Sequence, residues 1–253
     1  MIKVAVCGAC GKMGANILSL LDSDDEAVAI CGVDPMGESN SVKTVKSFSE
    51  LPCDGNDKPD VIIDFSSPKA LDGELEYAIK NNVPVVIGST GFTDEQLSKI
   101  DEAAKKVAIF RTANFSLGVN LLCKLVKQAA ETLGEKFDIE IIEKHHSQKV
   151  DAPSGTALML AHSANQAFDN AKPYVNGREG ICGKRGNEIG IHAVRGGTIV
   201  GEHEVDFCGE DEIITLSHSA RSKKVFAAGA IKAAKWLAGK GAGKYNMGDL
   251  LAD

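Results

Sequence analysis

A regular alternation of short β-branched runs with longer helical patterns over residues 1–112 constrains the fold most. Five runs rich in Val and Ile are expected to be strands: Ile2–Val6, Val28–Val33, Val61–Phe65, Val83–Ile87 and Val107–Arg111. Apolar residues at helical spacing predict helices over 13–21 and 70–80, and acidic residues at its start favour another over 94–105. Strands that alternate with helices predict βαβ units. We therefore expect an α/β fold with a Rossmann-like, doubly wound parallel sheet.

The pattern changes after about Asn114. A long helix is expected over 117–133, a strand over 137–143 and a second helix over 157–168. A glycine-rich, strand-like region follows from Gly177 to Ser217, and the last part of the chain returns to a helical pattern. These segments predict a second, α+β domain with a mixed or antiparallel sheet.

Composition and charge exclude several classes of protein. With 253 residues, the chain is long enough for two domains. Its 28 Lys and Arg against 35 Asp and Glu give a net charge of −7, which disfavours nucleic acid as a partner. No apolar run approaches the roughly 18 residues of a membrane span, and no signal peptide precedes the first strand. The seven cysteines are an odd number, which favours reduced thiols. We expect a soluble, cytoplasmic protein without membrane contact.

A glycine loop after the first strand predicts a dinucleotide site. Gly8, Gly11 and Gly14 lie where the strand ends and a helix begins, so the backbone can approach a pyrophosphate at the helix N-terminus. The Gly-x-x-Gly-x-x-Gly spacing is a weak signal by itself. Asp34, however, follows the second strand 20 residues after Gly14, where its carboxylate can accept hydrogen bonds from ribose hydroxyls. The alternative is that the glycines only allow tight packing and that Asp34 begins a turn before Pro35.

Asp34 also bears on the choice of cofactor. Its charge repels a 2′-phosphate and so favours NADH over NADPH, although Lys43 and Lys46 lie close enough in sequence to weaken that preference. Two further turns follow strands, at 88–91 and 112–115, and could form a nicotinamide and ribose surface or be ordinary turns.

Cys7-Gly8-Ala9-Cys10 raises a competing interpretation. A Cys-x-x-Cys near a βαβ unit can signal dithiol chemistry, and it is also half of a four-ligand zinc site. The motif lies inside the glycine loop, whose later glycines a redox dithiol does not need, and no second pair has zinc-site spacing. We expect no metal.

A dense polar segment over 143–157 is the strongest candidate for an active site. His145 and His146 can exchange protons near neutral pH, and Lys149 can pair with a carboxylate or donate a proton. Ser154 and the glycine after it open a helix, whose free N–H groups bind anions. This combination predicts a small carboxylated substrate. A solvated turn capped by Ser154 is the alternative.

The same segment carries a resemblance to a known family. Residues 143–157 match throughout the pattern Glu-x-His-His-x-x-Lys-x-Asp-Ala-Pro-Ser-Gly-Thr-Ala of the 4-hydroxy-tetrahydrodipicolinate (dihydrodipicolinate) reductases. Other segments are also similar to that family: 8–14, 61–66, 88–92, 113–119 and 195–203. The departures are Ser89 in place of a frequent threonine, Cys10 in the loop, and Asp34 without a following arginine. The last leaves the choice between NADH and NADPH open.

The resemblance implies a reaction and residue roles. The family reduces 4-hydroxy-2,3,4,5-tetrahydrodipicolinate, a small dicarboxylate, to tetrahydrodipicolinate with loss of water, in the diaminopimelate route to lysine. By resemblance, His145 is the acid–base residue, Lys149 is a proton donor, His146 binds substrate, and Gly155 and Thr156 hold a carboxylate.

The resemblance also implies a cofactor site and a domain organisation. The residues that would hold NADH or NADPH are Gly8, Ala9, Cys10, Gly11, Lys12, Met13, Asp34, Gly88, Ser89, Thr90, Thr112, Ala113, Asn114 and Phe115. A discontinuous dinucleotide-binding domain would comprise 1–113 and 221–253, and a substrate-binding and oligomerisation domain 114–220. A homotetramer and closure of the domains around the ligands are further expectations.

Two alternatives stay open at this point. One is another Rossmann oxidoreductase, such as a dehydrogenase of an amino-acid semialdehyde, which leaves segment 143–157 unexplained. The other is a non-catalytic NAD(H)-binding redox sensor, in which Cys7 and Cys10 or a dimer surface would matter.

Overall fold

The computed structural model describes all 253 residues, which form two compact units. The first unit contains Met1–Phe115 together with Lys223–Asp253, and the second contains Ser116–Ser222. No helix in either unit combines the length and the apolar character that crossing a membrane requires.

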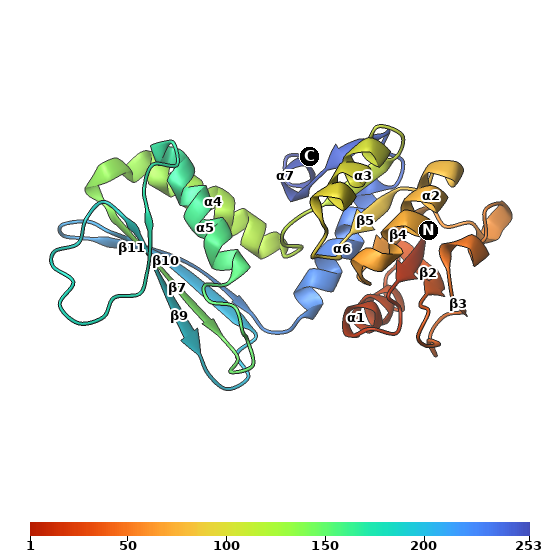
Figure 1. Ribbon diagram of the computed structural model, residues 1–253, viewed down its shortest axis with the longest axis horizontal. Helices are drawn as coiled ribbons and strands as arrows, with labels where there is room; N and C mark the ends of the chain where they lie inside the picture. Colours follow the sequence, from red (N-terminus) through yellow and green to blue (C-terminus); the bar gives the residue numbers. More distant parts are fainter. The chain divides into compact units, whose positions relative to one another are not determined.

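The first unit is built on one parallel sheet of seven strands (Figure 1). Its strands are β1 (Ile2–Cys7), β2 (Ala27–Val33), β3 (Thr44–Val45), β4 (Val61–Asp64), β5 (Val85–Ile87), β6 (Ala108–Arg111) and β12 (Gly243–Tyr245). They are arranged in the order β12-β6-β5-β4-β1-β2-β3, and every pairing is parallel. The order reverses at the β1–β4 pair, which is the switch point of a doubly wound fold. The predicted Rossmann-like sheet is therefore confirmed.

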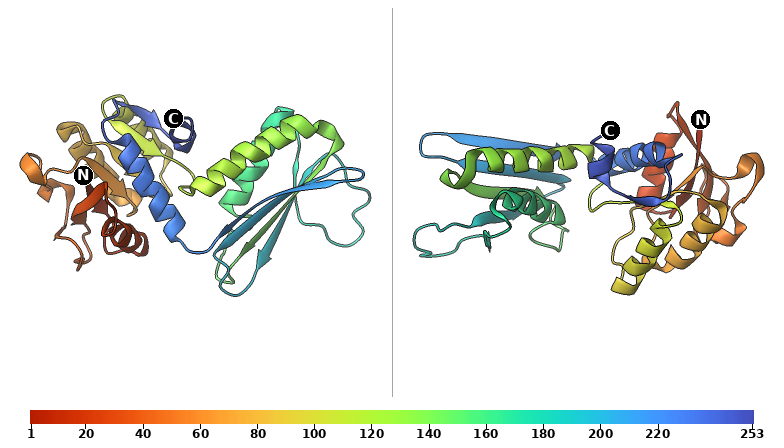
Figure 2. Two further views of the ribbon diagram at one scale, coloured as in Figure 1. Left: turned by 180° about the vertical axis from the view of Figure 1, so that it is seen from behind. Right: turned by 90° about the horizontal axis from the view of Figure 1, so that it is seen from above.

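Helices cover both faces of this sheet (Figure 2). They are α1 (Lys12–Leu21), α2 (Leu71–Asn81), α3 (Asp94–Ala104), α6 (Lys224–Leu237) and the short α7 (Met247–Leu250), with single 3₁₀ turns at Phe48–Glu50, Gly55–Asp57 and Pro68–Ala70. Helices α1 and α6 pack on one face, while α2 and α3 pack on the other. Because both faces are covered, the strand residues are buried on each side, which explains their nearly continuous apolar runs.

Two strands of the first sheet lie outside the predicted pattern. Strands β3 and β12 have two and three residues and lie at the two sheet edges. Strands this short show no hydrophobic periodicity, so sequence patterning could not detect them. The sequence pattern also missed that the C-terminal segment supplies a strand as well as a helix.

The second unit holds a mixed sheet of five strands. Its elements are α4 (Leu117–Leu133), β7 (Asp138–His145), α5 (Gly155–Asn165), β8 (Tyr174–Asn176), β9 (Ile189–Arg195), β10 (Gly201–Cys208) and β11 (Ile213–Ala220), with 3₁₀ turns at Gly134–Lys136 and Gln166–Phe168. The strand order is β11-β10-β7-β9-β8. Strand β10 runs antiparallel to β7 and β11, whereas β9 is parallel to β7 and β8. The sheet is thus mixed, as predicted.

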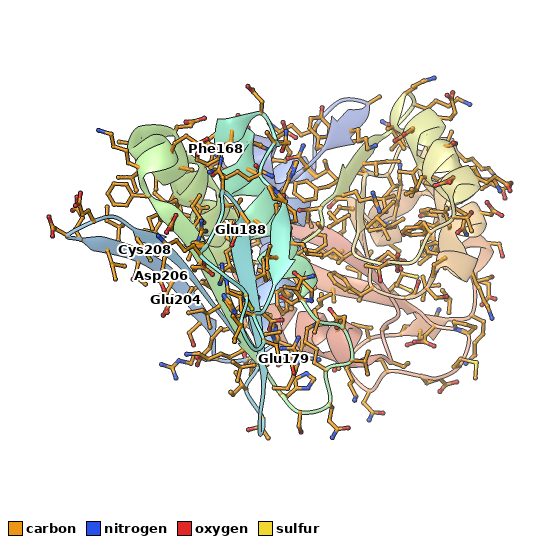
Figure 3. The ribbon with its side chains drawn as sticks, turned by 60° about the vertical axis from the view of Figure 1, so that its left-hand side comes forward. Phe168, Glu179, Glu188, Glu204, Asp206 and Cys208 are labelled. Carbon is orange, nitrogen blue, oxygen red and sulfur yellow. The ribbon has the colours of Figure 1, made fainter.

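Only one face of this second sheet carries helices. Helices α4 and α5 pack on it through a core that includes Val126, Leu160, Ile141 and Phe207. Residues of β10 alternate between buried and half-buried. Figure 3 shows three half-buried ones, Glu204, Asp206 and Cys208, in succession along the strand. The opposite face of the sheet therefore carries acidic side chains of β10 and is not covered by any helix of this unit.

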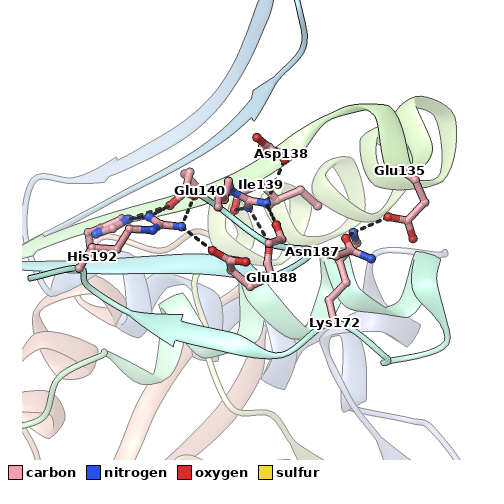
Figure 4. A network of polar contacts seen from close by, with 11 residues as sticks. Glu135, Asp138, Ile139, Glu140, Lys172, Asn187, Glu188 and His192 are labelled. Atoms are coloured by element: carbon pink, nitrogen blue, oxygen red, sulfur yellow. Dashed lines mark hydrogen bonds and ion pairs between the residues drawn. The ribbon is translucent and has the colours of Figure 1, made fainter. Parts of the chain in front are cut away.

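The segment 177–188 is not a strand, contrary to the strand-like character expected from Gly177 onward. It is irregular until β9 begins at Ile189. Charged side chains attach it to the sheet (Figure 4): Arg178 and Arg185 both donate to the Glu140 carboxylate of β7. His192 of β9 also pairs with Glu140, at 2.7 Å. Polar side chains and glycines, with little apolar area, therefore determine how this segment lies.

Candidate active site

The glycine loop connects β1 to α1 by a close backbone approach. Gly8 has a φ of +77°, and a Cβ there would lie 2.7 Å from the Phe65 carbonyl oxygen. A Cβ on Gly14 would lie only 2.1 Å from the Gly8 carbonyl oxygen. Both distances are shorter than atoms tolerate, so neither position accepts a side chain without movement of the backbone. The first turn of α1 is thereby held tightly against the end of β1.

The N-terminus of α1 is free of side-chain caps. Its N-cap residue is Gly11, which provides no side-chain hydrogen bond. The N–H groups of the first turn therefore have no side-chain acceptor, and together with the helix dipole they favour an anion. This is the arrangement expected of a pyrophosphate site.

Asp34 follows β2 and lies against the glycine loop. Its Oδ2 accepts from the Cys10 N–H at 3.0 Å, and its Oδ1 accepts from the Met36 N–H at 2.9 Å. Asp34 therefore does begin a turn at Pro35, as the alternative interpretation held, and it also connects the glycine loop to β2. A carboxylate has about four acceptor sites, so two remain for ribose hydroxyls.

The other predicted cofactor segments lie at the same end of the sheet as the glycine loop, because the carboxyl ends of parallel strands lie together. Gly88 follows β5, and the Phe65 ring occupies the place of its missing side chain, 2.4 Å from an added Cβ. Thr112 and Asn114 form a turn after β6. Phe115 is buried against Phe65, with ring centroids 5.3 Å apart. The Phe115 ring therefore belongs to the core.

A pocket of about 800 Å³ opens beside these strand ends. Its lining includes Pro35, Met36 and Ser66, together with the apolar and aromatic side chains of Phe48, Leu51 and Tyr77. Three lysines also line it: Lys46, Lys69 and Lys80. None of these residues was predicted as a site residue, because they come from separate loops and 3₁₀ turns between residues 35 and 69 and from α2, and form no continuous motif. The pocket has the size and the mixed polar and apolar lining of a nucleotide site.

The two loop cysteines lack the features of a redox dithiol. Cys7 is buried, and burial together with the negative charges of Asp64 and Glu74 raises its pKa. The pKa of Cys10 is also raised, by desolvation and by the Asp34 carboxylate. A reactive cysteine needs a lowered pKa. All seven cysteines of the structure are free.

In the second unit, the segment 143–157 brings a histidine and a carboxylate together. His145 is the last residue of β7, and its Nδ1 lies 2.5 Å from Glu143 Oε2. Glu143 is fully buried and also binds Arg195 of β9 through two 2.7 Å hydrogen bonds. The Ser154 N–H donates to Glu143 Oε1 at 3.0 Å. Burial alone would raise the pKa of Glu143, but the hydrogen bonds from Arg195, His145 and Ser154 hold it below its usual value.

His203 of β10 completes the cluster, although no chemistry was predicted for it. Its Nε2 lies 3.0 Å from Ser154 Oγ, and its ring packs edge-on against His145 with centroids 5.1 Å apart. Burial and the neighbouring His145 lower the pKa of His203 to about 4. His203 is therefore neutral at physiological pH. Arg195 and His203 both lie in the 195–203 segment, so the resemblance of that segment was the available signal.

The N-terminus of α5 presents groups suited to a carboxylate. Ser154 is the N-cap, and its hydroxyl accepts from the Ala157 N–H. A Cβ on Gly155 would meet no atom within 4 Å, so the space in front of this residue is open. His146 Nδ1 is buried without a hydrogen-bond partner, and Lys149 Nζ forms an ion pair with Asp151 at 2.7 Å. No group of three or more His, Cys, Asp or Glu side chains is placed to hold a metal ion.

Comparison with known proteins identifies the family. The family model "Dihydrodipicolinate reductase, N-terminus" matches residues 2–115, and "Dihydrodipicolinate reductase, C-terminus" matches 118–251. The chain belongs to the dihydrodipicolinate reductase family. The 4-hydroxy-tetrahydrodipicolinate reductase of Clostridium novyi is 47% identical over 252 residues, covering 99% of this chain and 98% of that protein. The reductase of Caldanaerobacter subterraneus is 48% identical with the same coverage.

Solved structures agree with this dihydrodipicolinate reductase assignment. A dipicolinate-bound dihydrodipicolinate reductase from Paenisporosarcina has a TM-score of 0.80 and 30% identity, covering 97% of each chain. A probable dehydrogenase from Thermotoga maritima has a TM-score of 0.61 at 12% identity, which indicates a shared fold only. The expected family is therefore confirmed, and the chain is an oxidoreductase with a Rossmann-like unit for NAD(P)H.

Proposed function

We infer that this chain catalyses the NAD(P)H-dependent reduction of 4-hydroxy-tetrahydrodipicolinate to tetrahydrodipicolinate, with loss of water, in diaminopimelate and lysine biosynthesis. Full-length similarity to reductases of that name supports the inference. The observation that carries it is the cluster of His145, Glu143 and Arg195 beside the uncrowded N-terminus of α5. Proton-transfer groups next to an anion-binding helix end suit a dicarboxylate whose ring gains negative charge.

For the cofactor, the residues of the first unit fit a dinucleotide. The Gly8–Gly14 loop and the free end of α1 would hold the pyrophosphate, and Asp34 the adenosine ribose. The strand-end residues Gly88–Thr90 and 112–115 would line the nicotinamide side. When bound, the dinucleotide supplies the hydride. The Asp34 charge favours NADH, because a 2′-phosphate would lie close to it.

Each polar residue of segment 145–156 has a proposed role. His145 exchanges a proton with the substrate. His146, whose Nδ1 has no protein partner, binds the substrate. Lys149 donates a proton near the ring nitrogen, for which its ammonium group must turn away from Asp151. The backbone at Gly155 and Thr156 holds a carboxylate. No metal ion takes part in the proposed reaction.

The second unit is proposed to bind substrate and to mediate assembly into a homotetramer. The helix-free face of its sheet is available for that purpose, and it carries two exposed apolar residues, Val194 on β9 and Ile213 on β11. The domains proposed to carry these functions comprise residues 1–113 with 221–253, and residues 114–220. We also propose a cytoplasmic location, which the seven free cysteines support.

A coupled assay tests the proposal. Purified protein is mixed with substrate generated from pyruvate and aspartate semialdehyde, and oxidation of NADH or NADPH is followed by absorbance. Oxidation should require both the protein and the complete substrate mixture. His145→Gln should lower the rate by at least about 100-fold, as expected for loss of a general acid–base group. No oxidation by folded protein that binds NADH would indicate a different substrate, and full activity of His145→Gln would refute the role of His145.

A further inference from the structure

We propose that Glu143 is a positioning residue that fixes the tautomer of His145, and that Arg195 keeps it ionised for this task. The proposal extends the proposed function, since it rests on His145 as the proton-exchanging group. Nothing in the motif spacing assigns this role to Glu143. The geometry of the cluster does.

The Glu143 carboxylate is saturated with hydrogen bonds. Oε1 accepts from Ser154 N–H and from Arg195 Nη2, while Oε2 accepts from Arg195 Nη1 and faces His145 Nδ1. Arg195 is always protonated and holds both oxygens bidentately. The lowered pKa of Glu143 means that the carboxylate carries no proton over the neutral range. All the groups around Glu143 are therefore donors.

An ionised carboxylate can only accept hydrogen bonds, so the proton between the two residues belongs to His145 Nδ1. A neutral imidazole then carries its lone pair on Nε2. The space beside Nε2 is kept clear by a glycine, since a Cβ on Gly201 would lie 3.1 Å from that nitrogen. Glu143 thus determines both the orientation of the ring and which nitrogen exchanges a proton with substrate.

Replacing Glu143 by Gln should reverse this assignment. The amide has one acceptor oxygen and one donor nitrogen where the carboxylate has two acceptors. The least unfavourable placement keeps the oxygen on Ser154 N–H and Arg195 Nη2, and turns the NH₂ group toward His145 Nδ1. That placement makes Nδ1 an acceptor and transfers the ring proton to Nε2. The same type of exchange in a Ser-His-Asp triad lowers turnover by about 10⁴-fold through the wrong tautomer.

The same strand offers a matched control. Glu140 also belongs to β7 and also binds a histidine and arginines, namely His192, Arg178 and Arg185 (Figure 4). It lies on the opposite face of the sheet, because it is three residues from Glu143 in an alternating strand. Glu140→Gln removes an equivalent charge and equivalent hydrogen bonds without touching His145.

The test compares Glu143→Gln, Glu140→Gln and the unaltered chain, each labelled with ¹⁵N in the histidine rings. Solid-state ¹⁵N spectra distinguish the two tautomers, and His145→Gln identifies the signals of His145. We expect the His145 proton on Nδ1 in the unaltered chain and in Glu140→Gln, and on Nε2 in Glu143→Gln. In the reductase assay, Glu143→Gln should lose at least about 100-fold in kcat with a much smaller change in KM, and Glu140→Gln should stay within about threefold.

The possible results separate this proposal from the proposed function. An unchanged tautomer in Glu143→Gln would overturn the positioning role, whatever happens to turnover. A changed tautomer with unaltered kcat would also overturn it, since the position of the proton would then not matter for the reaction. The tautomer is read without substrate, so a failure of the unaltered chain to oxidise NADH or NADPH would refute only the proposed function.

Discussion

Substitution of Gly14 by Ala tests whether the glycine loop is a precisely packed cofactor site. Gly14 lies in the first turn of α1, where Ala would ordinarily stabilise a helix by about 1 kcal/mol relative to Gly. Here the new Cβ would lie 2.1 Å from the Gly8 carbonyl oxygen and 2.8 Å from Ala9 Cα. Both neighbours are backbone, so no side-chain rotation can relieve the overlap, and α1 and the loop must move apart.

The expected net effect follows from two opposing terms. Overpacking of this kind costs about 1–3 kcal/mol, and we expect the upper end because only backbone movement can relieve it. After subtraction of the helix-propensity gain, the chain should lose about 2 kcal/mol of stability. For a protein of this size that corresponds to a decrease in melting temperature of about 4–8 °C. Displacement of the α1 N-terminus should also weaken NADH binding by roughly tenfold or more, or about 1.4 kcal/mol.

Gly73→Ala is the control for stability. Gly73 lies inside α2, and a Cβ there would meet the Phe48 ring at 3.7 Å, an ordinary contact. This variant should gain about 1 kcal/mol and melt about 2–4 °C higher. Melting is followed by circular dichroism and NADH binding by titration calorimetry. If Gly14→Ala were as stable as Gly73→Ala and bound NADH normally, the tight approach of the loop to α1 would play no part in cofactor binding.

Two further predictions concern charged side chains. Asp34→Asn keeps one acceptor for the Cys10 N–H but removes the charge near a 2′-phosphate, worth about 1 kcal/mol, so the NADPH/NADH ratio of kcat/KM should rise about fivefold; an unchanged ratio would exclude this role. Burial raises the pKa of Glu140, but hydrogen bonds from Arg178, His192 and Arg185 lower it to about 2, from 4.5. Because the folded-state pKa is depressed, the stabilisation is present above about pH 4.5 and is lost as the pH falls toward about 2. Glu140→Gln should therefore flatten the decline of melting temperature between about pH 5 and about pH 3, and an equally steep decline would contradict this assignment.

The sequence predicted much of the fold because its elements have clear periodicity. The five central strands of the first sheet and the helix Leu117–Leu133 follow directly from hydrophobic spacing. Strands β3 and β12 could not be found in this way, since they are short and depend on a neighbouring strand edge. Segment 177–188 was expected to be strand-like, but it is an irregular loop. Ion pairs from its arginines, and not backbone pairing, attach it to the sheet.

In the candidate site, likewise, some residues could be predicted from the sequence and others could not. His145, Lys149 and the helix opening at Gly155 are recognisable because they lie within one segment of sequence. The contact between Glu143 and Arg195 spans 52 residues, and it depends on the parallel register of β7 and β9, which pairs Glu143 with Ala193 and His145 with Arg195. The pairing of His203 with Ser154 depends likewise on β10. Strand register follows from the assembled sheet, so residue patterns alone could not predict these partners.

The first unit contains both the N-terminal and the C-terminal segments of the chain, which has a consequence for its synthesis. On a translating ribosome, residues 116–222 leave the exit tunnel before α6 and β12 do, although most of the parallel sheet precedes them. One face of that sheet lacks its cover until α6 emerges, and the β6 edge lacks its neighbouring strand until β12 emerges. The nascent chain thus exposes apolar strand surface, including Phe110, while the middle unit is already able to fold. Chaperone contact during synthesis should therefore concentrate on the N-terminal segment and end only when the last thirty or so residues have left the exit tunnel.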